Sequence, residues 1–277
     1  MPRESEHKYS TPDPRVPSQH SIITSRVTIR PKYALIPGSV LTNITSSALP
    51  SWKNLRCWVL TTPGIGYGTT FAEYLMYLEG GGGCNQPETE EGVESFLFVL
   101  DGKIELNVSG EVYSIPQGGF AFIPPDLEWE IQNPGEVLAK FLWVRKLYES
   151  SGDLQPQMFV GNESEIPEIP IEGFEGRVRT QYLFPRDDIA YDININLINW
   201  DPGSVIPLVE MHVNQHGLYM LQGQGVYLLN GEWHEVSAGD YIWMAPFCPQ
   251  AFICSGSTTA RYLLYKDVNR QFSLRGD

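Results

Sequence analysis

Short apolar runs bounded by turn residues dominate the pattern of hydrophobic and polar positions along the chain. The clearest of them are 71-FAEYLMYLE-79, 95-SFLFVL-100, 193-ININLINW-200 and 261-RYLLYK-266. They are rich in aromatic and β-branched residues, and Gly, Pro, Asn and Asp lie between them, which is typical of strands. Glycine turns such as DG at 101–102 and NG at 230–231 favour tight hairpins. Because no long segment has helical periodicity, the pattern predicts an antiparallel all-β protein.

The strand pattern occurs twice, about 120 residues apart. Segment 95–129 aligns with segment 216–250 without a gap, and FLWVRK at 141–146 continues the match in register with YLLYKD at 262–267. A repeat of this length indicates a duplicated domain rather than a solenoid unit. We therefore expect two tandem antiparallel β-barrels, each of which closes its own edges. The expected boundaries are an N-terminal extension with strands (1–55), a first barrel (56–149), a linker rich in Pro, Glu and Gly (150–180) and a second barrel (181–277).

Composition limits the partners that the chain can have. With 277 residues, of which 42% are apolar and 12% aromatic, it can bury real cores. Its formal net charge of -14 repels phosphate backbones and anionic lipids, so we expect neither nucleic acid nor a membrane as a partner. The N-terminus lacks the apolar core of a signal peptide, and no run approaches the ~20 apolar residues of a membrane span, so we expect a cytoplasmic protein. The four cysteines lack CxxC spacing and are expected to be free thiols.

Candidate metal chemistry is concentrated in the second copy. Two of the five histidines lie beside a carboxylate in 209-VEMHVNQHG-217. Residues two apart share one face of a strand, so Glu210 and His212 can meet one ion. His216 is expected to follow after a few irregular residues, and Gln250 to come from a later strand. Alone, E-x-H-x3-H would more often be a coincidence. The later G-x5-AP-x3-Q, at barrel spacing, favours a site with oxygen and imidazole ligands, suited to Mn²⁺ or Fe²⁺.

The combined pattern, E-x-H-x3-H-x6-G followed by G-x5-AP-x3-Q, resembles the two motifs of the cupin superfamily. The usual first His is replaced by Glu210, the usual acid by His216 and the usual last His by Gln250. With a first copy that has no histidine, the chain is similar to the (S)-ureidoglycine aminohydrolases, which are bicupins built of two double-stranded β-helix domains. The resemblance extends from about residue 30 to residue 270. It is carried by EMHVNQHGLYMLQGQGVYLLNGEW, AGDYIWMAPFCPQAF and RYLLYKDVNR.

This resemblance implies a Mn²⁺ ion, a small-molecule substrate and a homo-oligomer. The metal ligands that it implies are Glu210, His212, His216 and Gln250. The substrate contacts that it implies are Glu210, Gln250, Tyr262 and Lys266. The candidate catalytic residues are Lys266, Tyr262 and Glu210. The implied reaction is the hydrolytic release of ammonia from (S)-ureidoglycine to give (S)-ureidoglycolate, in purine and allantoin catabolism, with the metal as Lewis acid and template.

The residues themselves support this reading in part and leave alternatives open. Tyr262 and Lys266 alternate onto one strand face, although a core tyrosine and a solvated lysine at a strand end would fit the same pattern. The same ligands could also serve a manganese or iron cupin that oxidises or decarboxylates a small acid. Gln250 in the place of a last His makes a redox role less natural. A bicupin that binds a small ligand without turning it over is the third possibility.

The first copy lacks the ligands and is expected to be a scaffold. Where the second copy has its four candidate ligands, the first has Thr89, Glu91, Ser95 and Trp129. One carboxylate and no imidazole cannot hold a transition ion, and the ring of Trp129 would project into the space of the ion. Six further aromatic residues are expected to fill this barrel: Phe96, Phe98, Phe120, Phe122, Phe141 and Trp143. We therefore predict one Mn²⁺ per chain, in the C-terminal half.

Overall fold

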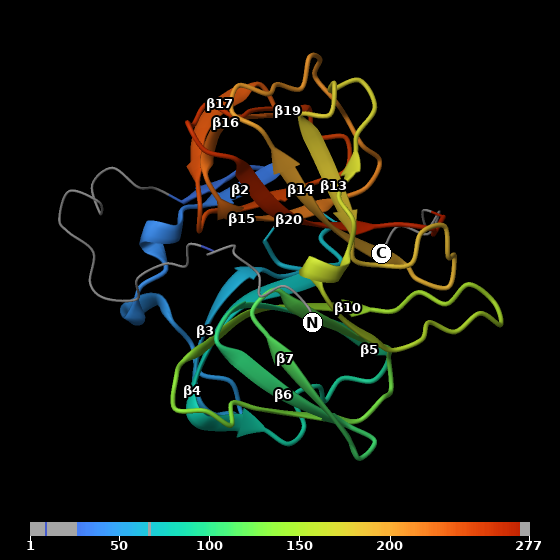
Figure 1. Ribbon diagram of the computed structural model, residues 1–277. Coiled ribbons are helices and arrows are strands. Elements are labelled where there is room, and N and C mark those ends of the chain that lie inside the picture. Colours follow the sequence, from blue (N-terminus) through green and yellow to red (C-terminus); the bar gives the residue numbers. More distant parts are fainter. Residues whose placement is uncertain (1–8, 10–26, 66–67, 272–277) are drawn as a thin grey trace.

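The computed structural model describes residues 9, 27–65 and 68–271, and the prediction of an antiparallel all-β fold is confirmed. In the described residues helical structure is limited to three 3-10 helices of one turn: Gly38–Val40, Asn43–Thr45 and Glu163–Glu165. Figure 1 shows two stacked halves, with the first copy below and the second copy, in yellow to red, above. No described helix is long and apolar enough to cross a membrane.

The second copy consists of a large antiparallel sheet that faces a small one. Its strands are β12 (Ile169–Pro170), β13 (Val178–Tyr182), β14 (Ile193–Trp200), β15 (His216–Gln222), β16 (Gln224–Leu229), β17 (Glu232–Ser237), β18 (Tyr241–Met244), β19 (Gln250–Ile253) and β20 (Ala260–Asp267). The order β18-β15-β20-β14-β13-β12 forms most of the large sheet, and β17-β16-β19 forms the small one. Side chains of both sheets, such as Leu218 and Phe252, share one core. This core is the interior of the second barrel.

The first copy repeats this arrangement. Its strands are β3 (Lys53–Thr61), β4 (Phe71–Cys84), β5 (Val93–Asp101), β6 (Lys103–Val108), β7 (Glu111–Pro116), β8 (Gly119–Ile123), β9 (Trp129–Gln132) and β10 (Ala139–Leu147). The strands β16, β17 and β19 begin 121 positions after β6, β7 and β9, as Gln224 against Lys103 illustrates. The gap-free repeat seen in the sequence therefore has the same strand layout in both copies.

Each sheet is extended by a strand that precedes the other copy in the sequence. Strand β2 (Tyr33–Ile36), which lies before the first copy and pairs with β1 (Thr28–Ile29), joins the second copy by pairing with β18. Strand β11 (Phe159–Asn162), which lies in the expected linker, joins the first copy by pairing with β8. The expectation that each copy closes its own edges is therefore wrong. The two copies exchange strands, so each large sheet includes a strand from the segment that leads into the other copy.

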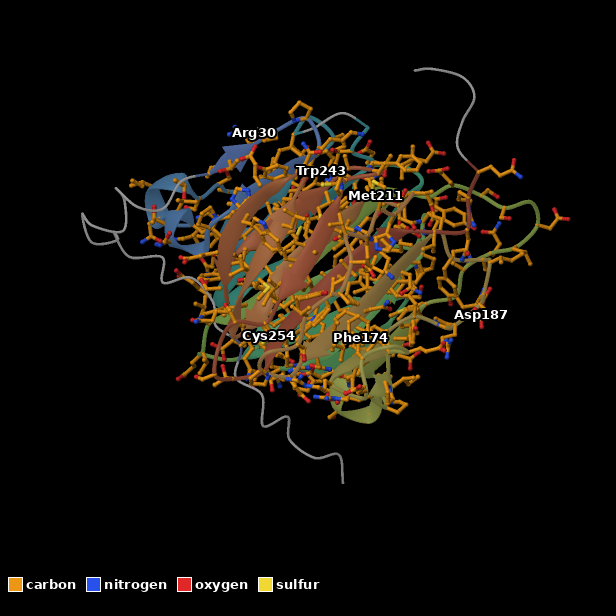
Figure 2. All side chains as sticks on the ribbon, turned by 90° about the horizontal axis from the view of Figure 1, so that it is seen from above. Arg30, Phe174, Asp187, Met211, Trp243 and Cys254 are labelled. Carbon is orange, nitrogen blue, oxygen red and sulfur yellow. The ribbon has the colours of Figure 1, made fainter. Side chains whose placement is uncertain are left out.

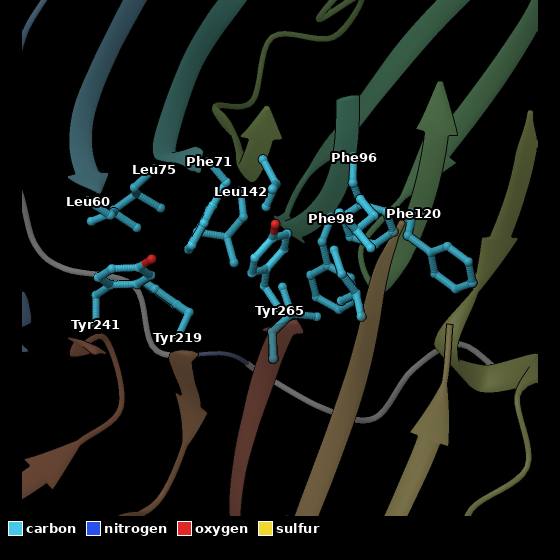
Figure 3. Close-up of a cluster of buried hydrophobic side chains, with 14 of the residues drawn as sticks. Leu60, Phe71, Leu75, Phe96, Phe98, Phe120, Leu142, Tyr219, Tyr241 and Tyr265 are labelled. Atoms are coloured by element: carbon cyan, nitrogen blue, oxygen red, sulfur yellow. The ribbon is translucent and has the colours of Figure 1, made fainter. Parts of the chain in front are cut away.

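A shared apolar core lies between the two copies (Figure 3). The first copy contributes phenylalanines such as Phe71 and Phe96 here, and the second contributes Tyr219, Tyr241 and Tyr265. The expected position of four aromatic residues is therefore wrong. They face the second copy and not the interior of the first barrel: Phe96, Phe98, Phe120 and Phe122. Three of the expected rings do fill that interior: Trp129, Phe141 and Trp143. Strands such as β5 are buried on both faces, so alternation alone does not reveal which face looks inward.

Buried polar contacts join the copies at the edge of this core. Lys146 Nζ lies 2.5 Å from Asp192 Oδ2, and both side chains are nearly inaccessible to solvent. Gly217 is packed so closely that an added Cβ would lie 2.8 Å from both Glu73 Oε2 and the hydroxyl of Tyr241. The four cysteines are free and buried, as expected. The large sheet of the second copy is therefore held against the first copy on one face and lines its own barrel on the other.

Candidate active site

Three candidate ligands lie in one short segment, and backbone hydrogen bonds bring this segment beside the fourth, Gln250, at one end of the second barrel. Glu210 and Gln250 form an isolated antiparallel bridge, with N···O distances of 2.8 and 2.9 Å in the two directions. His216 begins β15, and the backbone carbonyl of His212 accepts a hydrogen bond from the Phe247 amide at 2.7 Å. These backbone bonds bring the 210–216 segment alongside the loop that leads into β19.

The side chains of the first two candidate ligands lie at the mouth of the barrel. Glu210 Oε2 lies 3.3 Å from His212 Nε2, and the two side chains are 35% and 43% exposed. The rings of His212 and His216 are 5.2 Å apart between centroids. The strand expected to carry Glu210 and His212 is absent, because residues 211–215 are irregular. Met211 between them is 62% exposed; Figure 2, which looks down on the second copy, labels it.

The donor set fits a hard divalent ion, although the side chains are not gathered around one point. Among the described residues no three His, Cys, Asp or Glu side chains converge closely enough to hold a metal ion. His216 nevertheless has a buried Nδ1 without a hydrogen-bond partner in the described part of the chain, and it is 3% exposed. Burial, followed by the charges of Lys266 and His212, lowers the pKa of His216 well below its usual value. The imidazole is therefore neutral, which is the form that binds metals.

Lys266 and Tyr262 face the same interior as the candidate ligands. Lys266 lies opposite His216 in the β15–β20 pairing, and Tyr262 lies opposite Met220. Burial lowers the pKa of Lys266, while the nearby charge of Glu210 acts in the opposite direction. Burial also raises the pKa of Tyr262 far above its usual value, so its hydroxyl stays neutral. Lys266 is thus a partly buried cation beside the candidate ligands, and not a solvated strand end.

Sequence reasoning missed Tyr227, which completes the polar lining of this barrel. Its hydroxyl donates a hydrogen bond to Gln250 Oε1 at 3.0 Å, and Gln250 is 5% exposed. This bond fixes the amide so that its nitrogen and remaining oxygen lone pair are oriented. The signal was present in the repeat, because the aligned residue of the first copy is Leu106, whose side chain has no hydroxyl. A residue-by-residue comparison of the two copies would have identified Tyr227.

The corresponding end of the first barrel is built differently. Trp129 is 4% exposed and packs edge-on against Trp143, with 6.1 Å between ring centroids. Arg145, at the position of Lys266, makes two bonds of 2.6 Å to Glu88. The mouth is not sealed, however, because a cavity of about 580 Å³ lies there. Its acidic lining residues are Glu88, Glu90, Glu91, Asp126, Glu128 and Glu130.

Comparison with known proteins agrees with the fold and with the duplication. The family model for the cupin domain matches residues 74–145 and 196–265, one match in each copy. An (S)-ureidoglycine aminohydrolase from Arabidopsis thaliana is 37% identical over 227 residues, which are 81% of this chain and 72% of the relative. One from Escherichia coli is 33% identical over 242 residues, or 87% of this chain and 89% of the relative. The chain belongs to the (S)-ureidoglycine aminohydrolase family.

The family assignment confirms the resemblance that the motifs suggested, and it makes the chain an enzyme. A crystal structure described as a glyoxylate-induced protein from Pseudomonas aeruginosa shares the fold. It is 39% identical with a TM-score of 0.91, and the match covers 98% of this chain and 100% of that chain. The bicupin architecture of the (S)-ureidoglycine aminohydrolase family is therefore present along the whole described chain.

Proposed function

We propose that the chain releases ammonia hydrolytically from (S)-ureidoglycine and gives (S)-ureidoglycolate, in purine and allantoin catabolism. The observation that carries the proposal is the polar end of the second barrel, where His216 lies opposite Lys266, and Glu210 pairs with Gln250. Relatives over most of the chain are named for this reaction. The reaction adds the oxygen of water to the carbon that bears the amino group, breaks that carbon–nitrogen bond, and leaves ammonia with a proton from the water.

The proposal includes one Mn²⁺ per chain. Four residues would hold it: Glu210, His212, His216 and Gln250. The donor set of two imidazoles, one carboxylate and one amide oxygen suits manganese, and the neutral, buried His216 supports it. When bound, the ion supplies Lewis acidity and a template for the substrate's heteroatoms. Glu210 and His212 at the exposed mouth would have to move toward His216 to complete the set.

The residues of the chain itself supply orientation and proton transfer. Lys266, a partly buried cation, pairs with the substrate carboxylate, since a carboxylate is the strongest anionic feature of the substrate. Tyr262 keeps its proton and donates a hydrogen bond to the ureido carbonyl. Glu210 stands at the mouth and can accept a proton from the incoming water. Together these contacts select which nitrogen leaves and on which face water adds.

The test is ammonia release from freshly generated (S)-ureidoglycine by metal-depleted protein, with and without added Mn²⁺. The expected result is release well above spontaneous decay only in the loaded protein, with (S)-ureidoglycolate as the single enantiomer formed. A rate equal to spontaneous decay would show that the proposal is wrong. Oxygen uptake with candidate small acids would favour a cupin oxidase, and tight binding without turnover would favour a ligand-binding bicupin.

Two further features belong to the proposal. We expect a homo-oligomer, which light scattering coupled to gel filtration would detect as a mass that is a multiple of 31.2 kDa. We also expect a cytoplasmic enzyme, which subcellular fractionation would test.

A further inference from the structure

Two asparagines on β14, which are neither candidate ligands nor candidate catalytic residues, face the candidate site. Asn194 lies opposite Lys266 in the β14–β20 pairing, and Asn196 lies opposite Leu264. Residues directly opposite each other in antiparallel strands have side chains on the same face. Because Lys266 in turn lies opposite His216, a single row across three strands contains Asn194, Lys266 and His216. In Figure 1 these strands, β14, β20 and β15, lie side by side in the upper half.

The side-chain oxygens of both asparagines are buried and have no hydrogen-bond partner. Within the described residues, neither Asn194 Oδ1 nor Asn196 Oδ1 accepts a hydrogen bond. Asn196 is 3% exposed, so its amide is almost fully removed from bulk water. Buried acceptors without a donor cost free energy, and native proteins keep few of them without a reason. Both oxygens can therefore accept a hydrogen bond from a ligand that brings its own N–H donors.

The first copy has no amide at the two matching positions of β4. Arg145, which corresponds to Lys266, lies opposite Ala72, and Trp143 lies opposite Tyr74. Asn194 thus corresponds to Ala72, and Asn196 corresponds to Tyr74. The ring of Tyr74 packs on Trp143, with 5.5 Å between ring centroids. Amide oxygens at these positions occur only in the copy that has the candidate ligands. A purely structural role in the barrel would not require them, because the sister barrel is built without them.

We propose that Asn194 and Asn196 accept hydrogen bonds from the N–H groups of the substrate's ureido group, and so make the site selective for ureido acids. This inference rests on the proposed function. Tyr262 lies opposite Ile198, two residues further along β14, so Asn196 lies between the levels of Lys266 and Tyr262. A substrate whose carboxylate pairs with Lys266 and whose ureido carbonyl meets Tyr262 has its N–H donors at the level of the asparagines. A methyl group in the place of the ureido NH₂ removes the two donors of that group and would leave at least one of these acceptors without a donor.

The test compares two stable ligands that differ in one group. N-carbamoylglycine has a terminal NH₂, and N-acetylglycine has a methyl group in its place. Their dissociation constants are measured by calorimetry on manganese-loaded wild type, Asn196→Leu and Asn194→Ala. We expect wild type to prefer N-carbamoylglycine by about tenfold or more, and Asn196→Leu to reduce this ratio to near one, because the acceptor is lost. Asn194→Ala should reduce the ratio in the same direction, and the sister copy tolerates Ala at this place.

A matched control and a parallel assay separate the possible failures. Asn107→Leu makes the same chemical change at a first-copy asparagine whose Oδ1 is also buried and unpaired, and it should keep the wild-type ratio. Ammonia release by wild type is measured on the same preparation and decides the proposed function alone. If wild type releases ammonia but binds both ligands equally, or if neither asparagine variant changes the ratio, the inference is overturned while the function stands.

Discussion

Glu73 gives a prediction about how the two copies are held together. It lies on β4, is 1% exposed, and has Oε2 against Gly217 of the second copy. Burial raises the pKa of Glu73 to about 8 from an ordinary value of 4.5. The folded protein therefore keeps a neutral carboxylic acid between its copies at pH values where an unfolded chain has a carboxylate. Replacing it by glutamine, which is neutral at every pH, should remove this difference.

The magnitude follows from the two pKa values. Below pH 4.5 both states hold the proton, so the burial of Glu73 has no pH-dependent cost. As the pH rises toward about 8 only the unfolded state loses the proton, and the free energy of unfolding falls by about 1.4 kcal/mol per pH unit. The full interval of about 3.5 units corresponds to roughly 5 kcal/mol as an upper bound, since local relaxation and water entry reduce it. Above the folded pKa both states are ionised and no further loss occurs.

The assay measures urea unfolding of wild type and of Glu73→Gln at several pH values from about 5.5 to about 8.5. Tryptophan fluorescence monitors the unfolding. The free-energy difference between variant and wild type should grow in favour of the variant by about 3 kcal/mol across this range. Other buried acids, such as Glu94 and Asp240, titrate in both proteins and cancel in the difference. Glu79→Gln, at an exposed position of the same strand, is the control and should run parallel to wild type. A difference for Glu73→Gln that does not change with pH would refute the reasoning.

The remaining predictions concern the second barrel. Lys266→Ala should keep its manganese, measured by atomic emission, while ammonia release falls by about 100-fold or more, as expected for a lost charged contact in the transition state; unchanged turnover would show that the contacts of this strand face are wrong. His212→Ala should lose both the metal and the activity. Metal analysis of wild type should find one Mn²⁺ per chain, and one that survives replacement of both His212 and His216 would contradict the assignment to the C-terminal half.

Sequence reasoning was accurate where the information is local. The run predicted at 193–200 is β14 with the same bounds, because its alternation and flanking turns suffice to define a strand. The gap-free repeat is also present in the structure, since β16 and β17 begin 121 positions after β6 and β7. The candidate ligands Glu210, His212 and His216 could be found because they lie within seven residues of sequence. Their cluster did not depend on knowing the tertiary structure.

Features that depend on distant packing could not be predicted. Nothing within β2 indicates that Tyr33 will pair with Met244, more than two hundred residues away. The direction in which the side chains of Phe96 and Phe98 point also could not be predicted. Strand β5 is apolar on both faces, and each face packs against a different core. Irregular residues were expected just before His216, but the absence of a strand at Met211 and His212 was missed, since Glu210 pairs with Gln250 through a single bridge that no alternating pattern marks.

The duplication explains how an open barrel end can be held in a fixed geometry. On β15 and β20, residues that face the site alternate with residues that face the other copy: His216 is followed by Gly217, and Lys266 is preceded by Tyr265. The ring of Tyr265 stacks on Phe71 of the first copy, with 3.9 Å between centroids. This contact fixes the backbone on either side of it, and therefore the direction of Lys266. A first copy without ligands thus contributes to the chemistry through the backbone positions that it enforces, which gives a reason for its strands to persist where its ligands do not.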